Sequence, residues 1–412
     1  MISLAWTACS PAPTPPSILL VTLDTLRRDH VGAYGSPLGL TPHLDALAAE
    51  GLLHAAAYTT MPTTGPAHLS LFTGLQPHQH GGRRNGEPLL PEFAAREAAA
   101  LLREHGYTTA AFVSSTLISP SATGLRGFEI YDAPHEPLRA SDAVVSQALA
   151  WLNVEPRRPV FLWVHLYDAH APYGSADEKR RTLPVDVSSY GWVDPDRYPG
   201  PADRVEMEAR YARGVASADA ALGRLVAGVR ARLEQPPLVI AVADHGESLS
   251  EHLGERGYAY DHGKYLDEEG VAIPLLLAGP GVTPGRSTGT ASIRDLYTTI
   301  LEAAGVGDGL ARQEQRRDLR RPAEQRRIAR IERRRFRSDV PDSVRRHAAA
   351  AADGDELVIV AEDGSSPAAS DARLAELLRA ARELLDARRD HASAERVDPD
   401  TREALRALGY VD

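Results

Sequence analysis

The sequence predicts an α/β fold in which a mostly parallel sheet is covered by helices on both faces. Two observations indicate this class: short apolar runs rich in β-branched residues recur along the chain, and amphipathic helical patterns stand between them. Runs that are apolar at every position are typical of strands buried inside a parallel sheet. The predicted strands are residues 17–23, 108–114, 160–165, 238–243 and 274–279.

The segments between these runs have the features of amphipathic helices. Residues 41–51 combine an opening threonine, a proline at the first turn and a closing glycine, which are the start and stop signals of a helix. Apolar residues recur with helical spacing in three further segments. These predicted helices cover residues 91–106, 204–233 and 292–307.

The composition of the chain changes near residue 310. Residues 312–346 are dense in arginine, and we interpret this run as a solvated helix or a flexible connector, with an anion-binding patch as the alternative. Residues 356–364 look like part of an antiparallel hairpin. Two more helices are expected, an amphipathic one over 371–392 and a short one over 399–412. We therefore expect two units, a catalytic domain at 17–309 and an arginine-rich connector with a small α+β subdomain at 310–412.

The 412 residues carry a net charge of −10 and contain one cysteine, Cys9. The acidic balance argues against a general nucleic-acid binder, and a single cysteine excludes an internal disulfide. Residues 1–16 combine a short apolar stretch, Cys9 and a Pro/Ser-rich tether. This is similar to the end of a bacterial lipoprotein signal, and an irregular N-terminus is the other interpretation. The first implies a membrane tether through Cys9 in the cell envelope or periplasm, whereas the second is compatible with the cytoplasm.

Polar residues follow the ends of the predicted strands. Asp24 comes after the first run, and Asp244 and His245 come after the run at 238–243. Ligands of open α/β sheets bind outside the carboxyl ends of the strands, and gathered carboxylates and imidazoles are typical of a divalent-metal site. The alternative for each residue alone is an Asx turn, a helix cap or a hydrogen-bonded structural histidine. Further candidates after the other runs are Asp168, His170, His262 and Lys264.

The stretch TTMPTTGPAHLSLFTG, residues 59–74, places Thr64 directly before a short apolar helix with Pro66 near its first turn. Such a threonine either caps the helix or acts as a nucleophile at its positive end. Free N–H groups and the helix dipole favour an anion there, and a metal ion would activate the weakly acidic hydroxyl. The two roles are compatible because capping and anion binding use the same N–H groups.

Five motifs in order resemble the sulfatase branch of the alkaline phosphatase superfamily: ILLVTLDTLRRDHVGAYG, PTTGPAHLSLFTGLQPHQHG, FLWVHLYDAHAPY, VIAVADHGESLSEH and DEEGVAIPLLLAGPG. The resemblance covers residues 17–306 and implies a sheet sandwiched by helices. It implies that Asp24, Asp244 and His245 bind metal. It further implies that Thr64 is the nucleophile, that His170 and Lys264 contact the transferred group or protonate the leaving group, and that Arg28, His68 and Arg83 are substrate-binding candidates.

The chain departs from the formylglycine sulfatases at three motif positions. Thr64 stands where those enzymes have a cysteine or serine that is oxidised to an aldehyde, His68 replaces the motif arginine, and Thr25 replaces the second aspartate. A threonine nucleophile resembles instead the phosphodiesterase and nucleotide pyrophosphatase relatives, which use two metal ions. The resemblance therefore implies either one Ca²⁺ or a pair of Zn²⁺ or Mn²⁺ ions. In the two-metal case the ligands are Asp24, Thr64, Asp168, His170, Asp244, His245 and His262.

These observations predict a metal-dependent hydrolase of sulfuric or phosphoric esters that forms a covalent intermediate on Thr64. The expected substrate is a small molecule or a glycan ester, and His170, His262 and Lys264 are the remaining catalytic candidates. One alternative is a phosphoethanolamine-type transferase, which uses the same site. The other is a catalytically degenerate binding protein, favoured by the departures at Thr64 and His68.

Overall fold

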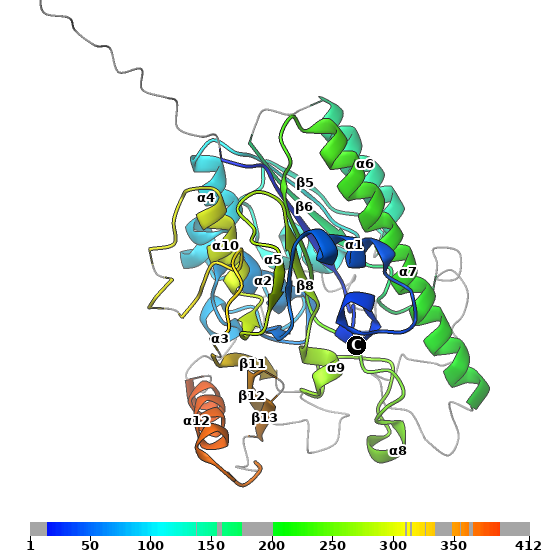
Figure 1. The fold of residues 1–412 in the computed structure, drawn as a ribbon, viewed down its shortest axis with the longest axis vertical. Helices are drawn as coiled ribbons and strands as arrows, with labels where there is room; N and C mark the ends of the chain where they lie inside the picture. Colours follow the sequence, from blue (N-terminus) through cyan, green and yellow to red (C-terminus); the bar gives the residue numbers. More distant parts are fainter. Residues whose placement is uncertain are drawn as a thin grey trace, which may run out of the picture.

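The computed structural model describes residues 15–136, 138–154, 159–174, 201–309, 311–313, 315–325, 327–333, 348–354, 356–361 and 366–387. Its centre is an eight-stranded sheet with the order β5-β4-β6-β1-β7-β8-β2-β9 (Figure 1). The strands are β1 (Ile18–Leu23), β2 (Leu52–His54), β4 (Thr108–Phe112), β5 (Ile130–Asp132), β6 (Val160–Leu166), β7 (Leu238–Ala243), β8 (Leu275–Ala278) and β9 (Gly285–Ser287).

The register of the central strands brings their carboxyl ends level. β1 pairs in parallel with β6 and β7, and Leu23 lies opposite both Leu166 and Ala243. Asp24 and Asp244 therefore leave the sheet side by side. β8 runs antiparallel to its neighbours β7 and β2, while the other pairings in this sheet are parallel. The predicted mostly parallel sheet is confirmed.

Helices cover both faces of the sheet (Figure 1). One face packs against α1 (Pro42–Glu50), α6 (Ser141–Val154) and α7 (Pro201–Arg232). The other side holds α2 (Thr64–Thr73), α4 (Ala98–Glu104), α5 (Pro120–Thr123) and α10 (Asp295–Ala303). All residues of β1, β6 and β7 are buried, so these strands contribute apolar surface to both layers.

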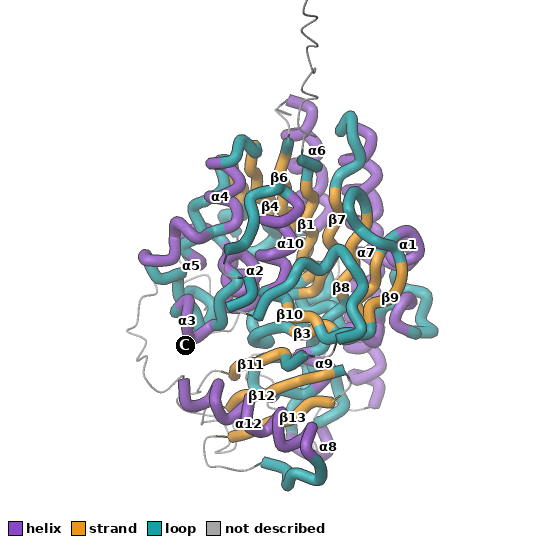
Figure 2. The backbone as a smooth tube through the Cα atoms, turned by 60° about the vertical axis from the view of Figure 1, so that its left-hand side comes forward, coloured by secondary structure: helices purple, strands orange, loops and turns teal. Residues whose placement is uncertain are grey.

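A small antiparallel sheet follows the main sheet in the chain (Figure 2). It contains β11 (Ala329–Arg333), β12 (Ala348–Asp353) and β13 (Glu356–Ala361), with β12 in the middle. One face packs against Tyr58 and Leu266 of the main domain, and the other packs against α12 (Ala372–Ala387). The alanines that fill β12 let both neighbouring layers approach closely. The predicted helix over 399–412 and Cys9 lie outside the described residues.

Two arginines of the arginine-rich segment are packed against the main domain, so the interpretation as a solvated connector is corrected at Arg316 and Arg333, whereas Arg321 is exposed. The Arg316 side chain is fully buried, forms an ion pair with Asp308 at 2.8 Å and lies over the Tyr297 ring. Arg333, at the end of β11, is also buried and donates to the Lys264 carbonyl oxygen at 3.0 Å. These arginines have internal partners, which arginine density alone does not reveal.

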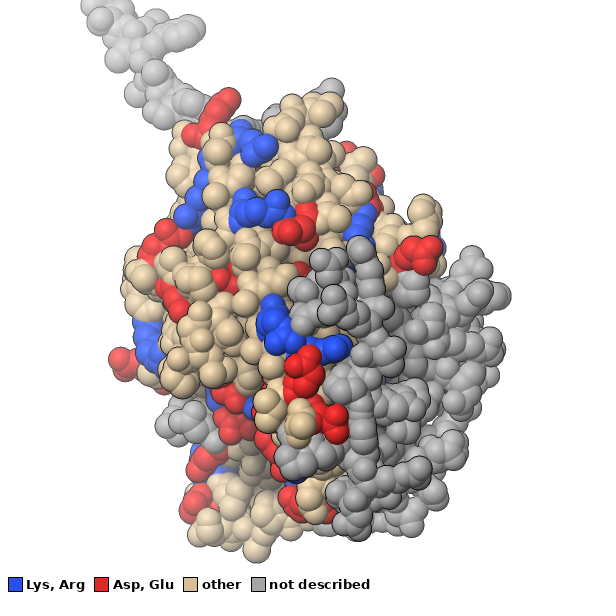
Figure 3. All heavy atoms as spheres, turned by 90° about the vertical axis from the view of Figure 1, so that its right-hand side faces the viewer, with Lys and Arg blue, Asp and Glu red and all other residues tan. Residues whose placement is uncertain are grey.

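Charges of both signs are interspersed over the described part of the face in Figure 3. In the described ranges, none of the helices is both long enough and apolar enough to cross a bilayer.

The first turn of α1 is capped from another helix. The amide groups of His43 and Leu44 donate to the two carboxylate oxygens of Asp219 on α7, at 3.0 and 2.8 Å. Thr41, the predicted cap, makes no side-chain cap bond. Asp219 therefore satisfies orphan amides and ties α1 to α7 in one interaction.

Replacing Asp219 with alanine should lower the free energy of unfolding by about 1–2 kcal/mol, because the buried Leu44 amide and the part-buried His43 amide lose their acceptor. Urea denaturation monitored by circular dichroism measures the effect. Asp142→Ala, which removes an exposed ion pair with Arg224 between α6 and α7, is the control and should cost less. Equal losses in the two variants would contradict the capping role.

Candidate active site

The carboxyl ends of β1 and β7 bring together Asp24, Asp244 and His245 in a fully buried cluster. One ligand atom from each residue lies within 4.8 Å of the others. His245 Nε2 lies 3.4 Å from Asp244 Oδ2 and 3.8 Å from Asp24 Oδ1. The sequence prediction that these three residues gather at one sheet edge thus agrees with the coordinates.

The atoms that face one another in this cluster are electron-pair donors. His245 Nδ1 lies 2.9 Å from the Gly246 carbonyl oxygen, so Nδ1 carries the proton and Nε2 presents its lone pair to the carboxylates. Burial lowers the pKa of His245 to about 4, which keeps the ring neutral. Asp244 Oδ2 is buried without a hydrogen-bond partner among the described residues. Converging oxygen and nitrogen lone pairs of this kind fit a divalent cation.

Two carboxyls in one buried cluster repel each other when both are ionised. Burial, followed by the nearby Asp24, raises the pKa of Asp244 to about 7. A bound cation would reverse this shift because it interacts favourably with the ionised form.

Thr64 is the first residue of α2, and its hydroxyl does not cap the helix. The N-cap is Thr63, which makes no side-chain cap bond, while Thr64 Oγ1 lies 3.3 Å from His245 Nε2. The expectation of several free amides at this helix end is wrong. The Gly65 amide donates to Asn85 Oδ1 at 2.8 Å, Pro66 has no N–H, and the next amide is bonded to the Thr63 carbonyl. An anion at this end would therefore be favoured mainly by the helix dipole.

His68 lies beneath Thr64, not on a substrate surface, so its predicted substrate-binding role is corrected. It is fully buried, and its ring nitrogens contact Thr64 O at 2.8 Å and Thr22 Oγ1 at 3.0 Å. Desolvation lowers the pKa of His68 to about 4. A neutral supporting ring stands where the family motif has a cation.

A second layer of polar residues supports the cluster, and the sequence reasoning assigned it no role. His165 Nε2 lies 3.2 Å from Asp24 Oδ2, and Trp163 Nε1 donates to Thr22 Oγ1 at 3.0 Å. Thr22 and His165 are paired across β1 and β6. A signal was available in the sequence: each is a polar residue inside an otherwise apolar buried run.

Two further imidazoles continue in a row from His245, which belongs to the cluster. The His245 and His262 ring centres are 4.4 Å apart, and the His262 and His170 centres are 5.0 Å apart. His170 also stacks on Tyr167 with centres 4.2 Å apart. His170 and His262 are thus brought near the cluster, although neither belongs to its closely spaced ligand group.

The turn that carries Lys264 packs against the segment before Thr64. Gly263 has a φ of +84°, and a Cβ there would lie 3.0 Å from Pro62 O and 3.2 Å from Thr63 Oγ1. Glycine is therefore required at this close approach. Lys264 is buried, forms an ion pair with Asp261 and lies 5.8 Å from the Tyr258 ring centre. This places the lysine on the turn adjoining the nucleophile candidate.

Asp168 is drawn away from the cluster, which corrects its predicted role as a metal ligand. Its two carboxylate oxygens accept from the Ser141 amide, at the start of α6, and from Ser217 Oγ on α7 at 2.9 Å. Arg28 is corrected as well, because it donates to the Ala55 carbonyl and pairs with the exposed Glu268. Arg83 is buried in the loop whose Asn85 holds the first turn of α2.

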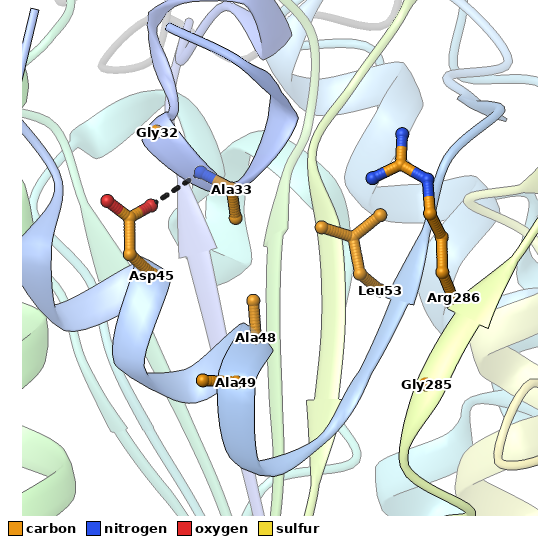
Figure 4. Close-up of a pocket in the computed structure, with 8 residues that line it drawn as sticks. All are labelled: Gly32, Ala33, Asp45, Ala48, Ala49, Leu53, Gly285 and Arg286. Atoms are coloured by element: carbon orange, nitrogen blue, oxygen red, sulfur yellow. Dashed lines mark hydrogen bonds between the residues drawn. The ribbon is translucent and has the colours of Figure 1, made fainter. Parts of the chain in front are cut away.

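A separate pocket of about 420 Å³ lies between α1, the 3-10 turn at 32–34, β2 and β9 (Figure 4). It is lined mainly by glycine, alanine and leucine. Its Asp45 carboxylate accepts from the Ala33 amide at 2.7 Å, as the dashed line shows. None of the predicted catalytic or metal-binding residues lines it.

Comparison with known proteins identifies the family of this chain. The sulfatase family model matches residues 16–306. The chain belongs to the sulfatase family. It is 24% identical over 347 residues to a Δ4,5-hexuronate-2-O-sulfatase of Bacteroides thetaiotaomicron, a match that covers 73% of this chain and 70% of the relative. Identity to the N-acetylgalactosamine-6-sulfatase of Canis lupus familiaris is 25%, with 74% and 65% covered.

Solved structures share this fold. One is a protein solved in complex with its substrate D-glucosamine-2-N,6-O-disulfate, with a TM-score of 0.69, 18% identity and coverage of 93% and 100% of the two chains. Another is the phosphonate monoester hydrolase of Agrobacterium radiobacter, with a TM-score of 0.64, 18% identity and coverage of 92% and 96%. The relatives and neighbours hydrolyse sulfate or phosphonate esters, and the family generally uses a divalent metal. The predicted family and ester-hydrolase class are confirmed at this level.

Divalent-metal affinity should rise with pH. Below a pKa of about 7 a cation must displace a proton from Asp244, so the apparent affinity should increase roughly tenfold per pH unit and level off above pH 7. Titration calorimetry with Ca²⁺, Mn²⁺ and Zn²⁺ at pH 6 and pH 8 measures this slope. Asp244→Asn should bind each ion more weakly and lose most of the slope. An affinity that is the same at both pH values would contradict this account.

Thr25, next to Asp24, holds a strained backbone. Its φ of +55° is rare for a β-branched residue, and its amide and carbonyl are held by Asp244 Oδ1 and the Tyr211 hydroxyl, at 3.3 and 2.8 Å. Its own hydroxyl is buried without a hydrogen-bond partner in the described part of the chain. Strain and an orphaned hydroxyl beside the cluster are together typical of a functional position.

Thr25→Val removes this hydroxyl at nearly constant volume. The metal-free chain should keep its melting temperature, because a buried unpaired hydroxyl contributes little stability, whereas divalent-metal affinity should fall about tenfold. Differential scanning fluorimetry and calorimetry measure the two quantities. Thr60→Val, another buried threonine whose hydroxyl has no hydrogen-bond partner, is the matched control and should leave affinity unchanged. Parallel behaviour of the two variants would exclude a role at the cluster.

Proposed function

We propose that the chain is a metal-dependent hydrolase of sulfate or phosphate-type esters that works through a covalent intermediate on Thr64. The observation that carries this proposal is the 3.3 Å contact between Thr64 Oγ1 and His245 Nε2 inside a group of converging electron-pair donors. A hydroxyl that is not needed as a helix cap, placed against a cation-binding cluster, is positioned for nucleophilic attack.

Asp24, Asp244 and His245 would hold the divalent cation, with the Thr64 and Thr25 oxygens beside them. When bound, the cation would supply Lewis-acid charge that lowers the pKa of an adjacent hydroxyl and offsets the negative charge of the ester group. His245 is oriented for this by the Gly246 carbonyl, and Asp24 by His165. Lys264 adds positive charge at the turn against Thr63.

The reaction divides into two displacements. The Thr64 hydroxyl gives its proton to the neutral imidazole of His170 or His262, and its oxygen attacks sulfur or phosphorus. The bond to the leaving oxygen breaks as that oxygen takes the proton from the imidazole. The imidazole, neutral again, then takes a proton from water. The hydroxide formed attacks the same centre, the bond to Thr64 breaks, and the Thr64 oxygen takes the proton back from the imidazole.

Several relatives act on sulfated sugars by name, and we infer a sulfated saccharide as the first substrate class to test. The buried carboxyl pair is a further argument for an active enzyme. Burial, followed by the nearby Asp24, raises the pKa of Asp244 to about 7, and a degenerate protein that binds no cation would gain nothing from this arrangement. The lipid tether at Cys9 and the envelope location stay predictions.

Thr64→Ala should lower kcat at least about 10³-fold, because no other described hydroxyl contacts His245 Nε2. Thr64→Ser keeps a hydroxyl and should retain measurable turnover. The assay compares p-nitrophenyl sulfate, p-nitrophenyl phosphate, bis-p-nitrophenyl phosphate and a sulfated disaccharide on metal-loaded protein. Unfolding curves of both variants serve as the control for folding.

Full activity of Thr64→Ala on any of these esters would contradict the assignment of the nucleophile. Turnover of sulfate esters that is lost in Thr64→Ala would establish a sulfatase that works without formylglycine. Turnover of phosphate esters alone would assign the chain to the phosphoesterase side of the family. Metal binding without hydrolysis would favour the transferase, which needs a hydroxyl acceptor in the assay.

A further inference from the structure

We propose that Glu247 is the positioning residue for His262, and that it selects Nε2 of this imidazole as the nitrogen that exchanges a proton with the bound ester. The inference rests on the proposed function and deepens it, because it assigns the reacting nitrogen of His262, one of the two proton-transfer candidates. The juxtaposition that carries it is the contact of 3.3 Å between Glu247 Oε1 and His262 Nδ1.

The backbone that carries the Glu247 side chain is fixed in place. Arg27 donates to the Glu247 carbonyl at 3.3 Å, and the preceding Gly246 amide donates to Gly270 O at 2.9 Å. A Cβ on Gly246 would lie 1.9 Å from Glu269 O, so the chain passes here at a distance that only glycine allows. Glu247 therefore cannot move away from His262 without breaking this local packing.

Other buried carboxyls of the molecule show what a structural role looks like. Asp219 accepts from two backbone amides of α1, and Glu97 accepts from the amides of Arg126 and Gly127. In the described residues no backbone amide donates to the Glu247 side chain. Its neighbours are the His262 ring and the Tyr173 hydroxyl.

Burying a carboxyl that organises no backbone costs several kcal/mol. Glu247 is fully buried, so this cost is offset by something other than helix capping or loop closure. The position of Glu247 suggests that holding the His262 ring is what offsets the cost of its burial. The ring that it holds lies 4.4 Å from His245, which in turn contacts the Thr64 hydroxyl.

The contact determines which nitrogen of His262 carries the proton in the resting ring. We assign the donor role to Nδ1–H and the acceptor role to Glu247 Oε1. Nε2 is then the nitrogen with the lone pair, so proton exchange with the leaving oxygen or water passes through it. Carboxylate partners of this kind fix both the tautomer and the ring plane of a histidine.

The test compares Glu247→Leu, which removes the acceptor, with Glu247→Gln, whose amide oxygen can still accept from Nδ1–H. Glu247→Asp keeps the carboxyl but shortens the side chain by one methylene, and replaces the leucine variant if that variant does not fold. Glu269→Gln is the matched control, because Glu269 forms a second carboxylate–imidazole pair with His252 away from the cluster.

The first readout is the tautomer of His262 in full-length protein labelled with ¹⁵N-histidine, with the resonance assigned from a His262→Gln spectrum. The wild type and Glu247→Gln should show protonated Nδ1. Glu247→Leu should populate the other tautomer, and Glu269→Gln should leave His262 unchanged. This spectrum does not depend on turnover, so it still decides the positioning role if none of the esters proves to be a substrate.

The second readout is kinetic. Glu247→Leu should lower kcat by about 10–100-fold with little change in KM, and Glu247→Gln should restore most of the loss. An unchanged His262 tautomer in both Glu247→Leu and Glu247→Asp would overturn the proposal. Equal losses of kcat in the glutamine and leucine variants would also overturn it, because a residue that acts through its acceptor oxygen must be rescued by glutamine.

Discussion

The repulsion between the carboxyls of Asp24 and Asp244 is the constraint on which the site depends. Because β1 and β7 are parallel and in register, Asp24 and Asp244 follow adjacent strand ends and lie side by side. The surrounding groups do not relieve the repulsion, since His68, His165 and His245 are buried with a pKa near 4 and remain neutral. A bound cation would relieve this repulsion. The strained backbone of Thr25 and the Thr64 hydroxyl both adjoin the residues that would hold it.

The fold could be predicted from the sequence because its signals are local and repeated. Each apolar run from 17–23 to 274–279 became a strand, and strong periodicity located α1, α7, α10 and α12. The direction of β8 could not be predicted, since a buried run looks the same whichever way it points. The short strands β2, β5 and β9 were missed because a run of three residues carries no period.

The site was predicted only as far as strand ends determine it. The rule that ligands bind at the carboxyl ends of strands identified Asp24, Asp244 and His245. Thr64 was identified from its position at the start of a helix, which is α2. Asp168 obeys the same rule, yet it holds Ser141 and Ser217, because two neighbouring helices offered donors that the sequence does not place in space. The inward position of His68 has a similar cause. Its ring contacts Thr64 O and Thr22 Oγ1, and the sequence does not show that α2 packs its second turn against β1.

The bond from Arg333 to the Lys264 carbonyl has a consequence for the order in which the enzyme matures. The main sheet is complete once β9 has been synthesised, and α10 and Leu319 then complete its core, so a nascent chain could fold this core before β11 is made. The turn bearing Lys264 would still lack the guanidinium that holds it from β11. During translation, structural stability would therefore precede catalytic competence, and a ribosome-bound intermediate would be folded before it could turn over an ester.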